Sequence, residues 1–263
     1  MKPILECRDL SKTFAGPQRL FKRNRGVTAV DRVSLRVMPE ETLAIVGESG
    51  SGKSTLGRLL LRLLAASAGE VLYKGESITD ASGARLNQLR RELQIIFQDP
   101  FASLNPRMTV QQIVGEPLWL HDRMSREARH ARVAELLRTV GLPAAWAERY
   151  PHEFSGGQRQ RIGIARALAS QPKLLLGDEP VSALDVSVQA QVVNLLESLK
   201  QQFGLTMIIV AHGLAVIRHM SDRVAVMYLG QIVEVATVDE IFDAPLHPYT
   251  QALIASAPQT QPG

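Results

Sequence analysis

The fold of this chain is decided by one stretch, Gly47-Glu48-Ser49-Gly50-Ser51-Gly52-Lys53-Ser54. It follows an apolar run, Thr42 to Val46, and precedes a run with helical spacing, Lys53 to Leu64. A strand, a glycine-rich loop of this spacing and a helix together match a phosphate-binding loop. The glycines let several backbone N–H groups converge on one anion, and the helix adds its positive N-terminal end.

This loop predicts the binding of a nucleoside triphosphate. We expect Lys53 to reach the β- and γ-phosphates and Ser54 to supply a hydroxyl to Mg²⁺. A chance match in a flexible loop is the alternative, and the flanking strand and helix argue against it. The expected binding residues are Gly47, Glu48, Ser49, Gly50, Ser51, Gly52, Lys53, Ser54 and Thr55.

Short runs typical of strands alternate with helical patterns along much of the chain. The further strand candidates are Gln94 to Phe97, Lys173 to Leu176, Thr206 to Val210 and Arg223 to Tyr228, and Val188 to Gln202 is a helix candidate. Buried strands that alternate with helices indicate a mostly parallel sheet covered on both faces. Arg223–Met227 and Gln231–Val235, separated by Leu229-Gly230, predict a hairpin.

Between Pro100 and Ser170 the strand signals disappear, and helical spacing such as that of Arg126 to Val140 takes over. Gly141 and then Pro143 supply a stop. We therefore predict a single α/β domain over residues 1–263, with a P-loop (RecA-like) core. The core has a mixed, mostly parallel sheet and an antiparallel β subdomain. The predicted parts are the core at 1–99 and 171–240, an inserted helical subdomain at 100–170, and a C-terminal extension at 241–263 with a loose tail after Ser256.

Composition and charge narrow the class of protein. The chain has 263 residues, 45% of them hydrophobic and 21% charged, which is ordinary for a globular protein. No apolar stretch approaches the roughly 20 residues that span a bilayer, and the early charges do not fit a secretory signal. The single cysteine, Cys7, is expected to pack in the core.

The net charge of +4 is partly local, because Arg19, Lys22, Arg23 and Arg25 crowd one segment. A solvated loop and a contact with anionic lipid or an acidic partner both remain open as interpretations. Nucleic-acid binding is disfavoured, because only Phe21 interleaves these charges.

Two carboxylates end the apolar run that leads to Gly177. We expect Asp178 to organise Mg²⁺ and Glu179 to polarise the attacking water. Acids at the C-terminal end of such a strand lie where ligands gather in this class of sheet. Gly177 is unusual within a strand, and we expect local slack there.

The stretch Phe154-Ser155-Gly156-Gly157-Gln158-Arg159-Gln160-Arg161 resembles the signature of the ABC ATPase family. It lies between the phosphate loop and the acidic strand, in the family's order. Further family features align in sequence: Gln98 resembles the Q-loop glutamine, Ser182-Ala183-Leu184-Asp185 the D-loop, His212 the switch histidine and Phe14 the aromatic that stacks on adenine. A lone histidine is usually structural, and an early aromatic often belongs to a core.

The resemblance implies a mechanism shared by two cassettes. Two such domains close head to tail on ATP and Mg²⁺, so Ser155 and Gly157 would act on the partner's nucleotide. Gly156, Gln158 and Asp185 are also implied to bind nucleotide. The implied catalytic residues are Glu179, His212, Gln98 and Lys53, and those implied to bind nucleotide also include Phe14, Gln98 and His212. The implied metal ligands are Ser54, Gln98 and Asp178.

Three stretches resemble one subfamily more closely, the importers of oligopeptides, dipeptides and nickel. They are Phe97 to Arg107, Val181 to Gln189 and Ile241 to Thr250. Gly213 departs from the subfamily, in which an acidic or amide residue commonly follows the histidine. Some relatives carry a C-terminal cysteine cluster for an iron–sulfur centre, which one cysteine cannot provide.

The resemblance implies an importer ATPase for a peptide, metal chelate or similar small solute. It would lie peripherally on the cytoplasmic face of the inner membrane. Its implied partners are two transmembrane permease subunits, a second ABC ATPase expected to be a different chain, and an extracytoplasmic solute-binding protein, with no nucleic acid. An ABC ATPase for another substrate or direction and a soluble ABC protein remain alternatives. The solute is not encoded in this chain.

Overall fold

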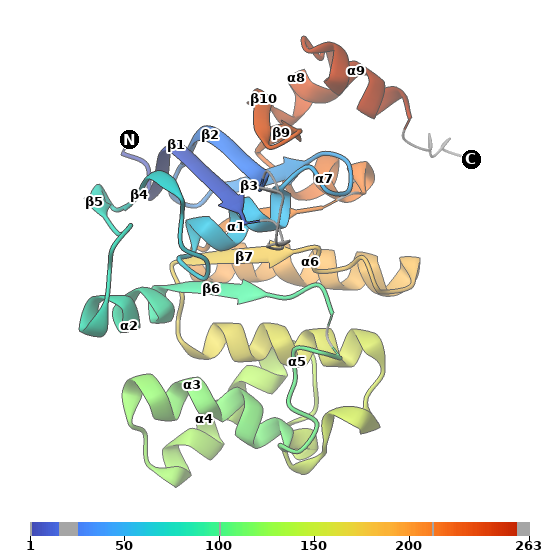
Figure 1. Cartoon of the computed structure of the whole chain (residues 1–263). Coiled ribbons are helices and arrows are strands. Elements are labelled where there is room, and N and C mark those ends of the chain that lie inside the picture. Colours follow the sequence, from blue (N-terminus) through green and yellow to red (C-terminus); the bar gives the residue numbers. More distant parts are fainter. Residues whose placement is uncertain (1, 16–25, 100, 212, 257–263) are drawn as a thin grey trace, which may run out of the picture. The chain divides into compact units, whose positions relative to one another are not determined.

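A computed structural model describes residues 2–15, 26–99, 101–211 and 213–256 of the chain (Figure 1). The basic segment at 19–25, His212 and the tail from 257 onward, which carried predictions, lie outside the described residues. The chain divides into two compact units, one of residues 1–81 with 210–263 and one of residues 82–209.

The first unit contains an antiparallel sheet, in the strand order β2-β1-β4-β5. Its strands are β1 (Leu5–Phe14), β2 (Val27–Val37), β4 (Ala68–Tyr73) and β5 (Glu76–Ser77). Leu5, Cys7 and Leu10 of β1 are buried. The pairing register of β1 with β2 shifts between Cys7 and Leu10, beside Asp9 at φ 45°. Such bulges strengthen the twist of a sheet. The predicted antiparallel β subdomain is therefore confirmed.

The same unit holds strands of the mixed sheet. Strand β3 (Thr42–Val46) pairs in parallel with β9 (Arg223–Tyr228), which pairs antiparallel with β10 (Gln231–Thr237). The hairpin is as predicted: Tyr228 lies opposite Gln231, and the two turn residues take φ 46° and 85°. Positive φ at both positions is the geometry that fits a twisted hairpin.

The helices of the first unit include α1 (Lys53–Leu60), which ends four residues before the predicted Leu64. Arg62 takes φ 56°, and the amides of Leu63 and Leu64 both donate to the carbonyl of Arg58. This turn of backbone satisfies carbonyl groups that the end of a helix leaves free. The remaining helices are α7 (Leu214–Met220), α8 (Val238–Asp243) and α9 (Pro248–Ala255).

The second unit begins with α2 (Gly83–Glu92) and carries three strands of the mixed sheet. Strand β6 (Leu93–Ile96) pairs in parallel with β7 (Leu174–Asp178), and β8 (Thr206–Val210) lies on the other side of β7. All residues of β7 and β8 are buried, as expected for central strands of an α/β sheet. Helix α6 (Val186–Phe203) connects β7 to β8 and ends at Gly204, which has φ 59°.

Between β6 and β7 the described residues form helices and no strand, as the sequence predicts. The helices are α3 (Val110–Asp122), α4 (Arg126–Thr139), α5 (Gly156–Ala169) and the short 3-10 turns η1 (Ala144–Glu148) and η2 (Pro151–Glu153). α3, α4 and α5 pack on one another (Figure 1). Thr109 and Ser125 cap α3 and α4 through their side chains. Gly141, at φ 75°, follows the end of α4, as predicted.

Among the described helices, none combines the length and the apolar character required to cross a membrane.

Cys7 is 1% exposed and its thiol donates to the carbonyl of Val33. Burial raises the pKa of Cys7 to about 12. A protonated, enclosed thiol fits the predicted packing role.

Candidate functional site

The phosphate loop lies in the first unit and has the close backbone approaches that its glycines predict. Gly47 has φ 147°, and a Cβ there would lie 2.1 Å from the carbonyl oxygen of Met227. Gly52 has φ 108°, and a Cβ there would lie 2.1 Å from the carbonyl oxygen of Ala29. Any side chain at either position would collide with backbone, so both glycines are required by the fold of the loop.

Lys53 is buried at the first position of α1. Its ammonium donates to the carbonyl oxygens of Gly47 at 2.8 Å and Glu48 at 2.7 Å. The lysine therefore lies across the loop that it is predicted to serve, within reach of groups bound there. Ser54 and Thr55 follow it in the first turn of α1, where N–H groups lack partners within the helix.

The tip of the β9–β10 hairpin holds the other side of the loop. The amide of Gly230 donates to the carbonyl of Ser51 at 3.0 Å, and the amide of Asp31 donates to the carbonyl of Gly230 at 2.8 Å. The amide of Ser51 donates to the carbonyl of Glu48 at 3.2 Å. The hairpin turn therefore supports the loop directly and is itself held by β2.

The acidic strand end lies in the second unit. Asp178 is the last residue of β7 and is 1% exposed. Glu179 follows it, with φ 51°, a left-handed backbone that costs a residue with a side chain roughly 1–2 kcal/mol. Backbone strain of this kind is common where a side chain must be aimed at a reacting group.

Gln98 and Glu179 are brought together, as the resemblance implies. The Nε2 atom of Gln98 donates to Oε2 of Glu179 at 2.7 Å. The hydroxyl and the amide of Ser182 both bond the carbonyl of Glu179, at 3.1 Å and 3.3 Å. The carboxylate and the backbone of Glu179 are thus each held by a separate contact.

The expected slack at Gly177 is wrong. The glycine lies inside β7, opposite Ile96 of β6, and is buried. A Cβ there would lie 2.9 Å from Cδ1 of Ile209 and 3.0 Å from Cγ of Pro180. Gly177 is therefore a point of close packing, which lets Pro180 turn back over the strand end.

The signature segment forms the start of α5. Ser155 accepts from the amide of Gln158 at 3.4 Å, and the Gln158 side chain accepts from the amide of Ser155 at 3.0 Å, which together make a capping box. Gly156 and Gly157 occupy the first turn. A Cβ on Gly157 would lie 2.3 Å from Cγ1 of Val188 in α6, so this glycine also permits close helix packing.

Two arginines of α5 contact the segment that follows Gln98, and the sequence analysis missed both. The guanidinium of Arg159 lies 3.6 Å from the ring centroid of Phe101, and Arg166 donates to the carbonyl of Ser103 at 2.7 Å. Burial lowers the pKa of Arg166. Arginines recurring on one helix are the sequence signal, but nothing in their spacing names the partner segment.

For three predicted site residues, Asp185, Phe14 and His212, the structure describes no contact with the other predicted site residues. Asp185 is exposed and immediately precedes α6, next to Val186, which is 82% exposed. Phe14 ends β1 with 42% of its surface exposed and with the ammonium of Lys12 at 5.3 Å from its ring centroid. An exposed ring suits stacking on a base better than a core position. His212 lies outside the described residues.

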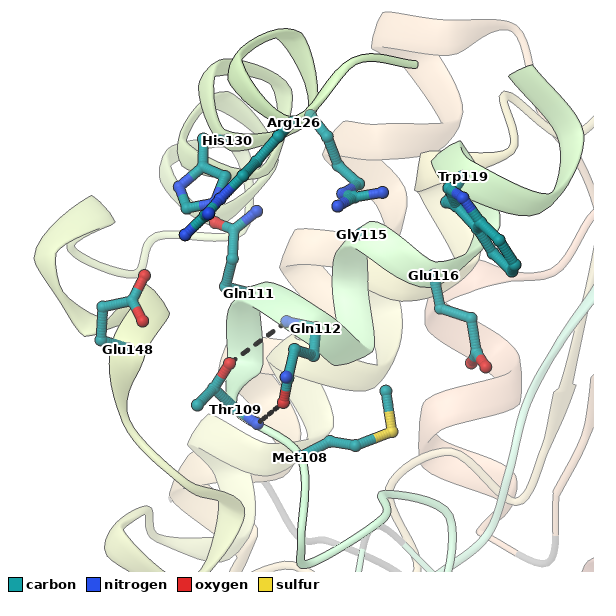
Figure 2. Close-up of a pocket in the computed structure, with 11 residues that line it drawn as sticks. Met108, Thr109, Gln111, Gln112, Gly115, Glu116, Trp119, Arg126, His130 and Glu148 are labelled. Atoms are coloured by element: carbon teal, nitrogen blue, oxygen red, sulfur yellow. Dashed lines mark hydrogen bonds between the residues drawn. The ribbon is translucent and has the colours of Figure 1, made fainter. Parts of the chain in front are cut away.

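A pocket of about 450 Å³ opens between α3, α4 and η1 (Figure 2). Trp119 and Glu116 of α3 line one part of it, and Arg126 and His130 of α4 line another. Gln111 is 6% exposed, and its Nε2 atom has no hydrogen-bond partner among the residues that the structure describes. This pocket was not predicted from the sequence.

A phosphate loop at the start of a helix, an acidic strand end and a capped Ser-Gly-Gly-Gln helix define a P-loop ATPase with the ABC signature. The family model for the ABC transporter matches residues 30–182, and the chain belongs to this family as an ATP-binding, ATP-hydrolysing subunit. A second model, described as the C-terminal region of oligopeptide/dipeptide transporters, matches residues 233–263.

Curated relatives agree over nearly the whole chain. The oligopeptide transport ATP-binding protein AppF of Bacillus subtilis is 54% identical over 98% of this chain and 79% of its own length. The corresponding OppF protein of Escherichia coli is 51% identical over 99% of this chain and 79% of its own length. The glutathione import ATP-binding protein GsiA of Pectobacterium atrosepticum is 49% identical over 99% of this chain, which covers 42% of that longer protein.

Solved structures support the fold. The cassette MJ0796, in a dimeric post-hydrolysis state bound to ADP and Pi, is 30% identical with a TM-score of 0.79, over 89% of this chain and 98% of that one. CbiO1 from Clostridium perfringens, part of the transporter complex cbiONQ, is 27% identical with a TM-score of 0.80, over 93% and 92%. The predicted fold class is therefore confirmed.

Proposed function

We propose that this chain drives the import of peptides or similar small solutes through separate permease subunits. The observation that carries the proposal is the C-terminal region at 233–263, which matches the model described for oligopeptide and dipeptide transporters. The names of AppF, OppF and GsiA support the same class of solute, since glutathione is itself a small peptide.

The site residues support a division of labour in ATP hydrolysis. The phosphate loop and Lys53 would bind the phosphates, and Phe14 would stack on the adenine. Glu179 would accept the proton of the attacking water, with Gln98 holding its carboxylate in place at 2.7 Å. His212 would complete the catalytic set.

We propose Ser54, Gln98 and Asp178 as the residues that hold Mg²⁺. All three offer oxygen atoms, which Mg²⁺ prefers as ligands. Asp178 fits the role because it is a buried carboxylate at the C-terminal end of β7, where ligands gather in this class of sheet. The ion would neutralise charge on the phosphates when bound.

The expected partners follow from the same proposal. Ser155, Gly156, Gly157, Gln158 and Asp185 would act on the nucleotide of a second ABC ATPase, which we expect to be a different chain. The assembly would lie at the cytoplasmic face of the inner membrane, with two permeases and an extracytoplasmic solute-binding protein.

The pocket between α3, α4 and η1 is the proposed contact for a permease. Trp119 is 58% exposed at its edge, and exposed aromatics are enriched at protein interfaces. The unpartnered donor of Gln111 would gain an acceptor from an inserted segment. Phe101, in the segment after Gln98, is 61% exposed and contacts the signature helix through Arg159.

The test is to purify tagged Glu179→Gln protein with ATP from gently solubilised native membranes and to identify its partners by mass spectrometry. The amide cannot take up a proton, so turnover stops while ATP binding and the closed pair persist. We expect two multi-span permeases and a second ATPase. Recovery with ribosomes, DNA-associated proteins or no membrane protein would contradict the transport function and leave the ATPase chemistry standing.

Trp119→Ala in the same purification tests the permease contact. We expect loss of the permeases with basal ATP hydrolysis unchanged, because Trp119 is not one of the residues proposed to bind nucleotide or to take part in hydrolysis. Phe203→Ala is the matched control, since this aromatic is also exposed but ends α6. Equal recovery of permeases with both variants would remove the pocket from the interface.

A further inference from the structure

The segment after β10 folds back within the first unit and is fixed by one carboxylate. The two oxygens of Glu234 accept from the amides of Leu246 at 2.8 Å and His247 at 3.0 Å. His247 then caps α9, its Nδ1 atom accepting from the amide of Tyr249 at 3.1 Å. Pro248 occupies the first position of the helix, where a missing N–H costs nothing.

This anchoring places the side chain of Tyr249 on the phosphate loop. Its hydroxyl oxygen accepts from the amide of Glu48 at 2.9 Å. Its ring packs on that of Tyr228 at the end of β9, with centroids 4.3 Å apart and planes inclined by 34°. Tyr249 therefore has both a polar and an aromatic contact that fix where its hydroxyl lies.

The bond falls on a peptide group that is also held from its opposite edge. The amide of Glu48 and the carbonyl of Gly47 belong to the same planar unit, and in a trans peptide they point in opposite directions. The carbonyl of Gly47 accepts from Lys53 at 2.8 Å, and the amide of Glu48 donates to Tyr249. Rotation of this peptide would break one bond or the other, so the two contacts together set its orientation.

We propose that Tyr249 is a positioning residue for the phosphate loop, and that the C-terminal segment from Glu234 to Tyr249 thereby tunes the affinity for nucleotide. This gives the C-terminal region a direct role in the ATPase site of its own chain. The proposal rests on ATP binding alone and does not depend on which solute is transported.

The first test is Tyr249→Phe in the full chain, with Mg²⁺-ADP binding measured by calorimetry and ATP hydrolysis by phosphate release. Phenylalanine keeps the ring on Tyr228 and removes only the acceptor of the Glu48 amide. One lost hydrogen bond predicts an increase in Kd and KM of between about two- and tenfold. We expect kcat to stay within about twofold, because Tyr249 touches no reacting atom.

Tyr228→Phe is the matched control. It removes a hydroxyl from the other member of the aromatic pair and should leave both Kd and KM unchanged. The melting temperatures of the two variants should agree with that of the wild type, which separates loop positioning from a loss of fold. An unchanged Kd in Tyr249→Phe, or a fall confined to kcat, would overturn the proposal.

Glu234→Gln tests the chain of contacts behind the tyrosine. An amide side chain can accept from only one of the two backbone amides and presents its own donors to the other. We expect the same direction of change in Kd, and a double variant with Tyr249→Phe no weaker than the weaker single variant, because both act through one contact. Fully additive effects would show that Glu234 does not act through Tyr249.

Discussion

At the scale of the residue, Gly177 shows how packing constrains the acidic strand end. An alanine there would bring Cβ within 2.9 Å of Cδ1 of Ile209 and 3.0 Å of Pro180. We expect Gly177→Ala to destabilise the protein by about 1–3 kcal/mol, the usual cost of overfilling a packed core. Urea unfolding followed by circular dichroism would measure the change. Turnover should fall as well, because Pro180 follows Glu179 directly.

Gly163→Ala is the control within the same unit. Gly163 is also buried, but it lies in α5 and a Cβ there would meet no atom within 4 Å. Alanine favours a helix over glycine, so this variant should be unchanged or more stable by about 1 kcal/mol. Equal destabilisation by both substitutions would show that the contacts around Gly177 are not the cause.

The sequence predicted the positions at which chemistry dictates the residue type, and it did not predict those at which packing dictates it. The spacing of the phosphate loop predicted its place before α1, and Gln98 was predicted to serve the same site as Glu179. Gly177 was misread because a single glycine in a strand has the same appearance whether space is absent or abundant. Only the positions of Ile209 and Pro180 in the fold distinguish the two cases: Ile209 lies on another strand, and the turn that brings Pro180 back over Gly177 is not evident from the sequence.

At the scale of the element, α5 carries both the signature and the contacts to the segment after Gln98. Arg166 is partly buried and donates to the carbonyl of Ser103 at 2.7 Å. We expect Arg166→Ala to loosen residues 101–104 without unfolding the protein. Hydrogen exchange measured by mass spectrometry should rise about tenfold there, the effect of losing roughly 1.4 kcal/mol of local stability.

Arg138→Ala provides the comparison, because Arg138 is an exposed arginine in the last turn of α4. It should leave exchange at 101–104 unchanged. If Arg166→Ala also left exchange at 101–104 unchanged, the contact with Ser103 would not be what holds the segment on α5.

The residues at which helices and strands end depend on tertiary contacts, which a local sequence pattern does not reveal. α1 was predicted to reach Leu64 because the helical spacing of leucines continues to that residue. It ends at Leu60, and the left-handed Arg62 turns the chain away. The bulges in β1 and β2 likewise interrupt the alternation by which strands are recognised, so the bounds of this sheet were not predicted.

Glu234 on β10 gives the C-terminal segment a defined response to pH. Burial raises its pKa, but the proximity of the Thr250 hydroxyl, the hydrogen bonds from the amides of Leu246 and His247 and the charge of His247 leave the pKa below its ordinary value of 4.5. A carboxylate with a lowered pKa stabilises the fold above pH 4.5, and this stabilisation is lost as pH falls through the lowered pKa. The melting temperature of Glu234→Gln should therefore lie below wild type at pH 7 and converge with it in acid. A gap that is constant across pH would contradict this.

At the scale of the whole molecule, the proposed mechanism pairs the signature residues of one ATPase with the nucleotide bound to a second ATPase. Ser155 is exposed at the start of α5, and its hydroxyl caps that helix by accepting from the amide of Gln158. Cassette MJ0796, at 30% identity, was solved as a dimer with ADP and Pi, which supports pairing. The sequence order of the motifs predicted this arrangement through resemblance alone, because contacts between subunits leave no periodic pattern in one chain.

Ser155→Arg tests the paired arrangement. A long cation on this exposed surface would obstruct a partner's nucleotide, whereas the phosphate loop lies in the other unit of the same chain. We expect nucleotide binding by the isolated subunit to stay within about twofold, and ATP hydrolysis by the assembled pair to fall at least about a hundredfold. Ser155→Arg both removes the helix cap and adds a long cation. Ser155→Ala separates these two effects, since it removes only the cap, worth about 1 kcal/mol. It should retain most of the paired activity. If the isolated Ser155→Arg subunit lost nucleotide binding while the alanine variant kept it, the signature would act on its own chain's nucleotide and the head-to-tail assignment would fail.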